Sequence, residues 1–283
     1  MDHLRIGVPS KGRLSEIAID LLTSAGLKFR RQDRSLFARV REMPVDVTFL
    51  RADDIPVLAA EGAIDMGITG SDLVAEADVD LVQRLPLGVG KCRLALCVKM
   101  DANFKSIKDL SGARIATSFP GITERFLAAH GVTAHLVKLT GSVEVMIALG
   151  VADAIVDLVE TGSTLAANRL EVLCDIGQYE TIIIQNRATP NPELCDRIVR
   201  RLEGVVIARS YSLLEYNIAR AKLREAEAIT PGFKSPTVNP LEDEGWCAIR
   251  VMVKSSDVIP AMEELEKLGA TAILETEIKN CRL

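Results

Sequence analysis

The residues best suited to chemistry lie in one stretch, where acidic residues on an apolar segment are followed by a hydroxyl-rich turn. The acids are Asp153, Asp157 and Glu160, and the turn contains Thr161, Gly162, Ser163 and Thr164. A turn that opens a helix offers backbone N–H groups and hydroxyls to a phosphate monoester. The carboxylates just upstream would repel phosphate, but they suit sugar hydroxyls or a Mg²⁺ ion. Together these residues predict a site for a phosphorylated ribose.

A structural interpretation of the same turn remains open. Serine and threonine are common N-terminal caps, so residues 161–164 could simply begin a helix after an ordinary buried strand. The acidic residues beside the turn favour the ligand-binding interpretation.

Cationic side chains follow two predicted strands nearer the N-terminus. Lys11 and Arg13 come after the strand at 4–8 and lead into a helix, and Arg51 comes after the strand at 45–50. In an open α/β sheet, ligands bind at the carboxyl ends of the strands. Cations at this edge would neutralise a pyrophosphate or a triphosphate, although a solvated basic loop would have the same composition.

Two segments repeat the same order of strand, Gly/Ser turn and helix. Residues 61–76 carry the turn Gly70-Ser71-Asp72, and residues 152–167 carry the turn described above. The repeat predicts two similar α/β lobes that face each other across a cleft, although all α/β units share part of this pattern. A third such turn, at 138–144, ends in Glu144. This residue is either a first-turn acid that favours the helix dipole or a hydroxyl acceptor in the cleft.

Two segments are suited to connect the lobes. The segment at 85–99 contains Gly-Val-Gly-Lys, but Leu85 and Cys92 break the P-loop pattern and Arg93 breaks the dinucleotide-binding pattern. We therefore expect a strand that is entered through a glycine-rich bend. Residues 179–185 are the expected return strand, and residues 190–216 are expected to be mostly helical.

The C-terminal part is expected to form a small module. A Pro/Gly-punctuated linker at 228–236 precedes a strand at 246–253, an amphipathic helix at 257–268 and a strand at 270–278. About 45 residues are too few to bury a core comfortably alone, so we expect the module to pair with its counterpart in another subunit.

Composition argues against several classes of protein. The 283 residues, 48% hydrophobic and 26% charged, predict a soluble globular protein of two or three domains. A net charge of −5 argues against nucleic-acid and membrane-surface partners. No apolar run reaches membrane-spanning length and the N-terminus lacks a signal-peptide core, so a cytoplasmic location is expected. The six cysteines form no C-x-x-C pair and are expected to be reduced, and the three histidines lie in no motif that would suggest acid–base chemistry.

Several segments resemble the ATP phosphoribosyltransferase family. They are KGRLSE at 11–16, GAIDMGITGSDLV at 62–74, CRLAL at 92–96 and GSVEVMIALGVADAIVDLVETGSTLAAN at 141–168. SPTVNPLEDEGW at 235–246 and the CR pair at 281–282 resemble the long form, which carries a regulatory domain. The resemblance covers essentially the whole chain, and its central motif is long and specific.

The resemblance implies an activity and a fold. Such enzymes join N1 of ATP to C1 of phosphoribosyl pyrophosphate and release pyrophosphate, with Mg²⁺ on the pyrophosphate, in the first committed step of histidine biosynthesis. The implied fold is α/β, with a two-lobed core similar to periplasmic binding proteins and a small C-terminal α+β domain of the ferredoxin or ACT type. The expected parts are residues 1–94 and 180–210 for lobe I, residues 95–179 for lobe II, and residues 211–283 for the regulatory domain.

The resemblance also implies roles for individual residues. The 5′-phosphate is expected at Thr161, Gly162, Ser163 and Thr164, and the ribose side at Asp157 and Glu160. The phosphates of ATP or the pyrophosphate are expected at Lys11, Arg13, Arg51 and Arg93, with Asp72 directed toward the nucleotide. Lys11, Arg13 and Asp157 are the expected catalytic residues, and Glu144 and Asp153 are further expected substrate contacts. No covalent nucleophile is required, because inverting displacement at a ribosyl carbon needs leaving-group neutralisation and orientation.

Regulation by histidine is implied as well. Family members bind histidine between the regulatory domains of neighbouring subunits, and the matching positions here are Asn217, Ser235, Thr237 and Ala272. Long forms exchange active dimers with less active, histidine-bound hexamers. Some relatives have an aspartate where this chain has Asn217. We therefore expect weaker inhibition here, because an amide does not pair its charge with the histidine ammonium.

Two rival functions share the fold. A solute-binding protein would have two similar lobes, but the N-terminal sequence and the acids before the turn count against it. A regulatory paralogue would keep the fold without turnover, but the intact Lys11, Arg13 and 161–164 turn argue against that.

Overall fold

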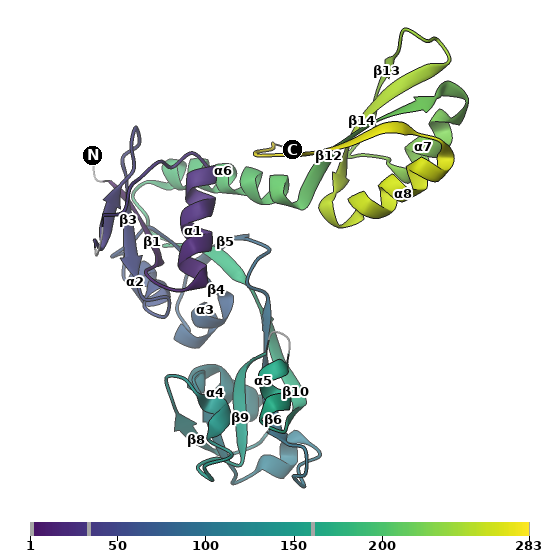
Figure 1. Ribbon diagram of the computed structural model, residues 1–283. Coiled ribbons are helices and arrows are strands. Elements are labelled where there is room, and N and C mark those ends of the chain that lie inside the picture. The colour runs from purple at the N-terminus through teal and green to yellow at the C-terminus, as the bar shows by residue number, and fades with distance from the viewer. Residues whose placement is uncertain (1–2, 33–34, 160–161, 283) are drawn as a thin grey trace. The chain divides into compact units, whose positions relative to one another are not determined.

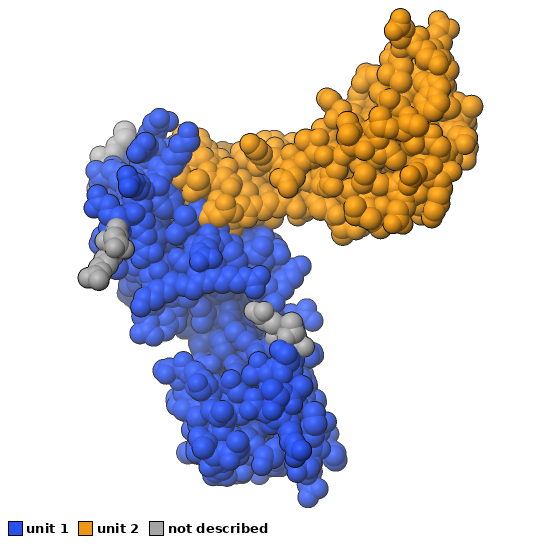
Figure 2. Space-filling view, viewed as in Figure 1, with its two compact units in different colours: residues 1–19, 28–196 blue, residues 20–27, 197–283 orange. Residues whose placement is uncertain are grey.

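The computed structural model describes residues 3–32, 35–159 and 162–282 of the chain. The chain forms two compact units, one made of residues 1–19 and 28–196 and the other of residues 20–27 and 197–283 (Figure 2). Helices α1 (Arg13–Ser24) and α6 (Pro192–Ser210) each begin in the first unit and end in the second. None of the described helices is both long enough and apolar enough to cross a bilayer.

The first lobe of the first unit is built on a six-stranded sheet with the order β2-β3-β1-β4-β11-β5. Its strands are β1 (Leu4–Pro9), β2 (Phe37–Arg39), β3 (Val45–Leu50), β4 (Met66–Gly70), β5 (Val82–Pro86) and β11 (Thr181–Gln185). β1 runs parallel to β3 and β4, whereas β11 runs antiparallel to β4 and β5. β1 is buried along most of its length, which explains its apolar sequence in the middle of a parallel sheet. Helices α2 (Ile55–Ala60) and α3 (Ser71–Ala77) follow β3 and β4.

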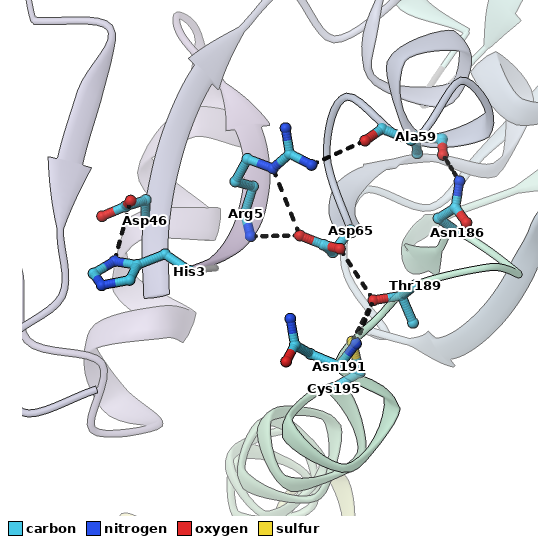
Figure 3. Close-up of polar contacts among 10 residues, drawn as sticks. His3, Arg5, Asp46, Ala59, Asp65, Asn186, Thr189, Asn191 and Cys195 are labelled. Carbon is cyan, nitrogen blue, oxygen red and sulfur yellow. Dashed lines mark hydrogen bonds and ion pairs between the residues drawn. The ribbon is translucent and has the colours of Figure 1, made fainter. Parts of the chain in front are cut away.

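A polar network joins the chain segments at the amino ends of β1 and β4 (Figure 3). The buried Asp65 carboxylate accepts hydrogen bonds from the Arg5 amide at 2.8 Å and from the Thr189 hydroxyl at 3.0 Å. Asn186 donates a hydrogen bond to the carbonyl of Ala59 at 2.5 Å. These contacts tie the amino edge of the sheet to the segment that follows β11, so this edge has a structural role.

The second lobe is built on a five-stranded sheet with the order β10-β6-β9-β7-β8. Its strands are β6 (Cys92–Lys99), β7 (Arg114–Thr117), β8 (His135–Lys138), β9 (Ala154–Val159) and β10 (Leu170–Tyr179). Its helices are α4 (Pro120–Ala129), α5 (Ser163–Ala167) and the short 3-10 helices η1 (Ile107–Leu110) and η2 (Val143–Val145). Along β6, Leu94, Leu96 and Val98 belong to one core, and Ala95 and Cys97 belong to another. Burial on both faces therefore explains the unbroken apolar run LALCV.

Two chain connections join the lobes (Figure 1). Residues 87–91 lead from β5 to β6, and Glu180 alone leads from β10 to β11. They coincide with the glycine-rich bend and the return strand that the sequence predicts. The two-lobed α/β architecture is thereby confirmed.

The second unit contains a four-stranded antiparallel sheet with the order β13-β14-β12-β15. The strands are β12 (Tyr211–Ala219), β13 (Thr237–Pro240), β14 (Trp246–Lys254) and β15 (Thr271–Glu277), and α7 (Leu223–Ile229) and α8 (Val258–Leu268) are its helices. Two further 3-10 helices, η3 (Arg220–Lys222) and η4 (Ser255–Asp257), precede α7 and α8. The order of elements is β-α-β-β-α-β, which is the ferredoxin-like arrangement predicted for this module. Leu214, Tyr216 and Ile218 alternate along β12 and fill its core.

One expectation for the C-terminal part is confirmed and one is wrong. Residues 190–216 are mostly helical, since α6 spans Pro192–Ser210, although residues 211–216 begin strand β12, whose alternate residues are buried. Residues 228–236 are not a linker between modules, since they end α7 and connect it to β13 within one sheet. The module therefore has twice as many strands as the pair at 246–253 and 270–278 indicated.

Candidate functional site

The carboxyl edge of the first sheet gathers several of the predicted site residues. β1 and β3 end in register, with Pro9 opposite Leu50, and β4 lies on the other side of β1. Lys11 and Arg13 follow β1, Arg51 follows β3, and Asp72 follows β4 in the first turn of α3. The topology thus brings three cations and one carboxylate to one edge, as the sequence predicts.

The cations at this edge are exposed. Within the described parts of the chain, the side chains of Lys11 and Arg13 form no ion pair. Arg51 lies 3.4 Å from Asp53, and their side chains are 74% and 57% exposed. Since an exposed pair of this kind contributes little to stability, all three cations are available to an anionic ligand.

Asp72 differs from its neighbours in being buried, with 7% of its surface exposed. Burial raises the pKa of its carboxyl, although hydrogen bonds from the amides of Leu73 and Asp72 itself act in the opposite direction. A carboxylate that is withdrawn from water and held by the first turn of a helix has a defined orientation. Asp72 is therefore a fixed acceptor rather than a mobile surface charge.

The hydroxyl-rich turn of the second lobe borders a pocket of about 380 Å³. This turn pocket is lined by Glu144, Asp157, Leu158, Val159, Gly162, Ser163, Thr164 and Leu165. Gly162 has φ +77°, a left-handed conformation that favours glycine, and it directly precedes α5. Because α5 spans only 5 residues, its dipole is small, and the donors of the turn are its hydroxyls and amides. The pocket therefore combines donors suited to phosphate with acceptors suited to sugar hydroxyls.

Asp157 is the better defined acid in this pocket. Its carboxylate accepts a hydrogen bond from the Leu158 amide at 2.8 Å. Burial raises the pKa of Asp157, and the nearby Glu144 carboxylate raises it further. Glu144 thus lies in the pocket as the hydroxyl-acceptor interpretation requires, although it also stands in the first turn of η2.

Asp153 is a correction to the expected site. It precedes β9 at the amino end of the strand, whereas the turn follows the carboxyl end. Its carboxylate is held by the guanidinium of Arg114, with Nη2 to Oδ1 at 2.8 Å. A six-residue strand separates Asp153 from the turn, so the acid cannot face the same ligand. Glu160 and Thr161, also expected in the site, lie outside the described residues.

Arg93 lies in a second pocket, of about 650 Å³, which we call the hinge pocket. It is lined by Ser71, Gln83, Arg84, Leu85, Pro86, Lys91, Cys92, Arg93, Val159, Gln178, Tyr179, Glu180 and Ile182. Arg93 donates to both carboxylate oxygens of Asp175, at 3.0 and 3.2 Å. Val159 lines both pockets, so the hinge pocket adjoins the turn pocket.

Several residues of the hinge pocket are not among the site residues that the sequence predicts. Lys91 belongs to the Gly-Val-Gly-Lys segment, which matches no nucleotide-binding motif, so the sequence alone does not assign its charge to a site. Arg84 donates hydrogen bonds to Gln185 and to Asp196, the latter at 2.6 Å. Tyr179, whose pKa is raised by burial, is the last residue of β10. The useful signal is that these residues lie in or close to the two connections between the lobes.

The residues expected to bind histidine occupy different parts of the second unit. Asn217 pairs with Ala248 on one side and Thr271 on the other, and Ala272 follows Thr271. Thr237 lies on β13, opposite Arg250, so β14 separates it from Asn217. Ser235 lies in the loop before β13.

A pocket of about 500 Å³ adjoins that loop. It is lined by Tyr211, Ile229, Thr230, Pro231, Gly232, Phe233, Met252, Val253, Lys254, Asp257, Pro260, Ala261 and Glu264. The rings of Tyr211 and Phe233 are 5.4 Å apart, which gives the pocket an aromatic wall.

The described residues contain no cluster of three or more metal-binding side chains. Glu144 and Asp157 nevertheless place two carboxylates in the turn pocket. Two hard oxygen donors fit Mg²⁺ only when phosphate oxygens and water complete its six-ligand shell.

All six cysteines are free thiols, as predicted.

Comparison with known proteins finds relatives along the whole chain. The family model described as ATP phosphoribosyltransferase matches residues 51–204, and the model for the C-terminal domain of that family matches residues 208–280. An ATP phosphoribosyltransferase of Rhodopirellula baltica is 62% identical over 280 residues, which cover 99% of this chain and 94% of the relative. The ATP phosphoribosyltransferase of Mycobacterium tuberculosis is 40% identical over 286 residues, with 99% of each chain covered. The solved ATP phosphoribosyl transferase (HisG:HisZ) complex from Thermotoga maritima matches with a TM-score of 0.65 and 29% identity, over 72% of this chain and 98% of that chain.

Proposed function

Because the chain belongs to the ATP phosphoribosyltransferase family of histidine biosynthesis, a group of glycosyltransferases, we propose the following course for its reaction. N1 of ATP attacks C1 of phosphoribosyl pyrophosphate, and the bond from C1 to the pyrophosphate oxygen breaks. The products are N1-(5-phospho-β-D-ribosyl)-ATP and pyrophosphate. Positive charge develops on the ribose ring during the displacement, so the enzyme must align the two reactants and neutralise the leaving group.

The phosphoribosyl group binds in the turn pocket of the second lobe, residues 95–179. Ser163, Thr164 and the amides of the turn hold the 5′-phosphate, with Thr161 completing the set. Asp157 and Glu144 accept hydrogen bonds from ribose hydroxyls, with Glu160 beside them. The observation that supports this assignment is the turn pocket itself, where hydroxyls and carboxylates line one space in a member of this family.

Cations at the carboxyl edge of the first lobe's sheet, together with Arg93 on β6 of the second lobe's sheet, receive the phosphates. Lys11, Arg13 and Arg51 stand at the carboxyl edge of the sheet, and Arg93 lines the hinge pocket. Their charge offsets the charge that builds on the departing pyrophosphate. Asp72 faces the nucleotide, where a buried acceptor can bind a base or ribose N–H or O–H group.

A divalent cation, which we take to be Mg²⁺, neutralises the pyrophosphate when it is bound. Glu144 and Asp157 are the side chains of the turn pocket that would reach it. The substrate supplies most of its oxygen ligands, because among the described residues that line the pocket only these two carry carboxylates.

Histidine regulates the enzyme through the C-terminal domain, residues 211–283. Asn217, Ser235, Thr237 and Ala272 contribute to its site between domains of neighbouring subunits in a hexamer, and the active form is a dimer. The pocket beside the Ser235 loop supports this proposal, because its aromatic wall and its Lys254, Asp257 and Glu264 side chains suit a zwitterion with a flat ring.

The proposed reaction is tested with purified protein, ATP, Mg²⁺ and phosphoribosyl pyrophosphate, by following product absorbance with and without histidine. Ser163→Ala combined with Thr164→Ala should raise the KM for phosphoribosyl pyrophosphate and leave the KM for ATP nearly unchanged. Each lost hydrogen bond to a charged phosphate costs about 1.5–3 kcal/mol, which corresponds to roughly ten- to a hundredfold in KM.

Ser111→Ala is the matched control, because Ser111 is an exposed hydroxyl in the same lobe outside the turn pocket. If the double variant behaves like this control, the phosphate binds elsewhere. Wild-type protein that binds the substrates without forming product would instead favour a regulatory paralogue.

A further inference from the structure

Helix α3 of the first lobe and helix α4 of the second lobe bind each other's ends. The Glu76 carboxylate on α3 accepts hydrogen bonds from the amides of Gly121 and Ile122, at 2.7 and 2.9 Å. These amides belong to the first turn of α4, where N–H groups have no partner within the helix. The residue before α4, Phe119, provides no side-chain cap. The cap of α4 is therefore supplied by the other lobe.

The contact also runs in the opposite direction. Arg125, one turn further along α4, donates a hydrogen bond to the carbonyl of Ala75 near the end of α3. Its guanidinium also lies 3.6 Å from the Asp78 carboxylate. A cation at the negative end of one helix and an anion at the positive end of the other are both favourable. We call this set of contacts among Ala75, Glu76, Gly121, Ile122 and Arg125 the interlobe clasp.

The close approach depends on a glycine. A Cβ atom at Gly121 would lie 3.1 Å from the carbonyl oxygen of Glu76 and 3.1 Å from its Oε1. Both distances are shorter than ordinary van der Waals contact, so any larger residue would push the helices apart. The sequence thus leaves space at position 121 for the Glu76 carboxylate.

The other end of α3 is tied to the connections between the lobes. The Ser71 amide donates to the carbonyl of Glu180 at 2.9 Å, and the Glu180 amide donates to the Ser71 hydroxyl at 3.1 Å. The Glu180 carboxylate accepts a hydrogen bond from the Gly88 amide, in the other connection, at 3.1 Å. Asp72 comes directly after Ser71. The helix that carries this buried carboxylate is therefore held at its start by Glu180, which also binds the other connection, and at its end by the second lobe.

We propose that the interlobe clasp sets the distance between the carboxyl edge of the first lobe and the turn pocket of the second, and that Glu76 is its positioning residue. Glu76 acts through α3 and α4 and lines neither pocket. The side chain of Arg125 is 46% exposed, so water weakens the ionic part of the contact. The clasp therefore matters more for orientation than for stability. A reaction between two substrates bound to different lobes depends steeply on that orientation.

Amide hydrogen exchange tests the clasp without reference to activity. Glu76→Ala in the full-length protein should speed exchange of the amides in the first turn of α4 by roughly tenfold, because it removes both of their acceptors. Gly121→Ala should have a similar effect by steric displacement, with Glu76 and Arg125 intact. Glu124→Ala, which removes an exposed acid from the same helix, is the matched control. Exchange that matches this control in both variants would overturn the clasp.

Kinetics test its positioning role, and this arm rests on the proposed function. Glu76→Ala should lower kcat/KM for the transfer by roughly ten- to a hundredfold, as expected when reacting groups are misplaced. Binding of ribose 5-phosphate, a probe that needs the turn pocket alone, should be unchanged. Glu76→Gln retains one acceptor oxygen and should restore part of the rate. Equal losses in ribose 5-phosphate binding and in kcat/KM would show general damage to the lobe and overturn the positioning role.

Discussion

Arg114 and Asp153 join the amino ends of β7 and β9 by two hydrogen bonds between their side chains, at 2.8 and 3.2 Å. The amide of Arg114 donates a third bond to the same carboxylate at 2.9 Å. The Arg114 guanidinium holds the pKa of Asp153 below its ordinary value, and the amide acts in the same direction. An acid that the sequence places next to a ligand is thus occupied by the protein itself, at the end of β9 away from the turn.

Asp153→Asn should leave kcat/KM unchanged and lower the free energy of unfolding by no more than about 1 kcal/mol, since both side chains are partly exposed. Because the folded pKa of Asp153 is lowered, its contribution is present above the unfolded pKa of about 3.9 and is lost as pH falls through the folded value. Denaturant titrations at neutral and acidic pH measure the difference. A lower kcat/KM in this variant would show that Asp153 contributes to substrate binding or catalysis after all.

Asp157→Asn should lower kcat/KM by about tenfold or more, because an amide replaces a charged acceptor beside the ribose. The pKa of Asp157 is raised by burial, so wild-type activity should fall on the acid side at a higher pH than an ordinary aspartate would give. The variant should lack this acid limb. A pH–rate profile of the two proteins measures it, and identical profiles would remove Asp157 from the reaction.

Asp72→Asn should combine greater stability with weaker nucleotide binding. The pKa of Asp72 in the folded state is raised by burial. Between the unfolded and folded pKa values, the folded state therefore retains a proton that the unfolded state has released. Wild-type stability therefore declines as pH rises from the unfolded pKa through the folded one, while that of the variant does not. The Tm of the variant should exceed that of wild type at neutral pH and match it in acid. Asp53→Asn, at an exposed acid on the same edge, is the control.

Tyr216→Phe should destabilise the C-terminal domain by about 1 kcal/mol. The Tyr216 hydroxyl lies 2.8 Å from the Thr230 hydroxyl in a buried pair. In the variant, the Thr230 hydroxyl still donates a hydrogen bond to the carbonyl of Ala226 at 3.2 Å, so this buried hydroxyl is not left unpaired. Tyr211→Phe, at a half-buried tyrosine of the same strand, provides the comparison. Equal unfolding free energies for both variants would mean that the buried pair adds nothing.

Asn217→Asp should tighten inhibition by histidine. A charge-assisted hydrogen bond exceeds a neutral one by about 1 kcal/mol, which corresponds to roughly fivefold in the inhibition constant. Inhibition curves at fixed substrate concentrations measure this change. Asn239→Asp on β13, opposite Ala248, controls for the added charge. Inhibition as tight in wild type as in Asn217→Asp would remove the basis of the expectation.

Much of the fold follows from local sequence patterns. The run VDVTFL at 45–50 coincides with β3, and Gly162 directly precedes helix α5 within the turn that the sequence predicts. β10 is recognisable only at its end, because register shifts between Val172 and Cys174 and between Asp175 and Gly177 disrupt its alternation. The sequence does not mark the point where α6 gives way to β12, because neither proline nor glycine separates the two elements.

The site residues likewise divide into those whose position follows from local sequence and those whose contacts depend on distant residues. Position at a strand end could be inferred for Lys11, Arg51 and Asp72, since it depends on the nearest strand alone. The partners of Asp153 and Glu76 could not be inferred, because Arg114 and the α4 amides are distant in sequence. Such contacts arise only when the sheets are assembled, and no local periodicity records them.

The single residue that links β10 to β11 leaves that connection no slack, whereas residues 87–91 give the other one several. Extra residues at position 180 would separate the strands that carry Tyr179 and Thr181, and would unseat the start of α3. The loop at 87–91 should tolerate natural length variation or a tethered reporter better, provided that the bond from the Gly88 amide to the Glu180 carboxylate and the backbone bonds of Leu87 and Val89 to Thr181 are kept. The two connections should therefore differ in how well they tolerate insertions, both in natural relatives and in engineered proteins: residues 87–91 can vary in length, whereas Glu180 cannot.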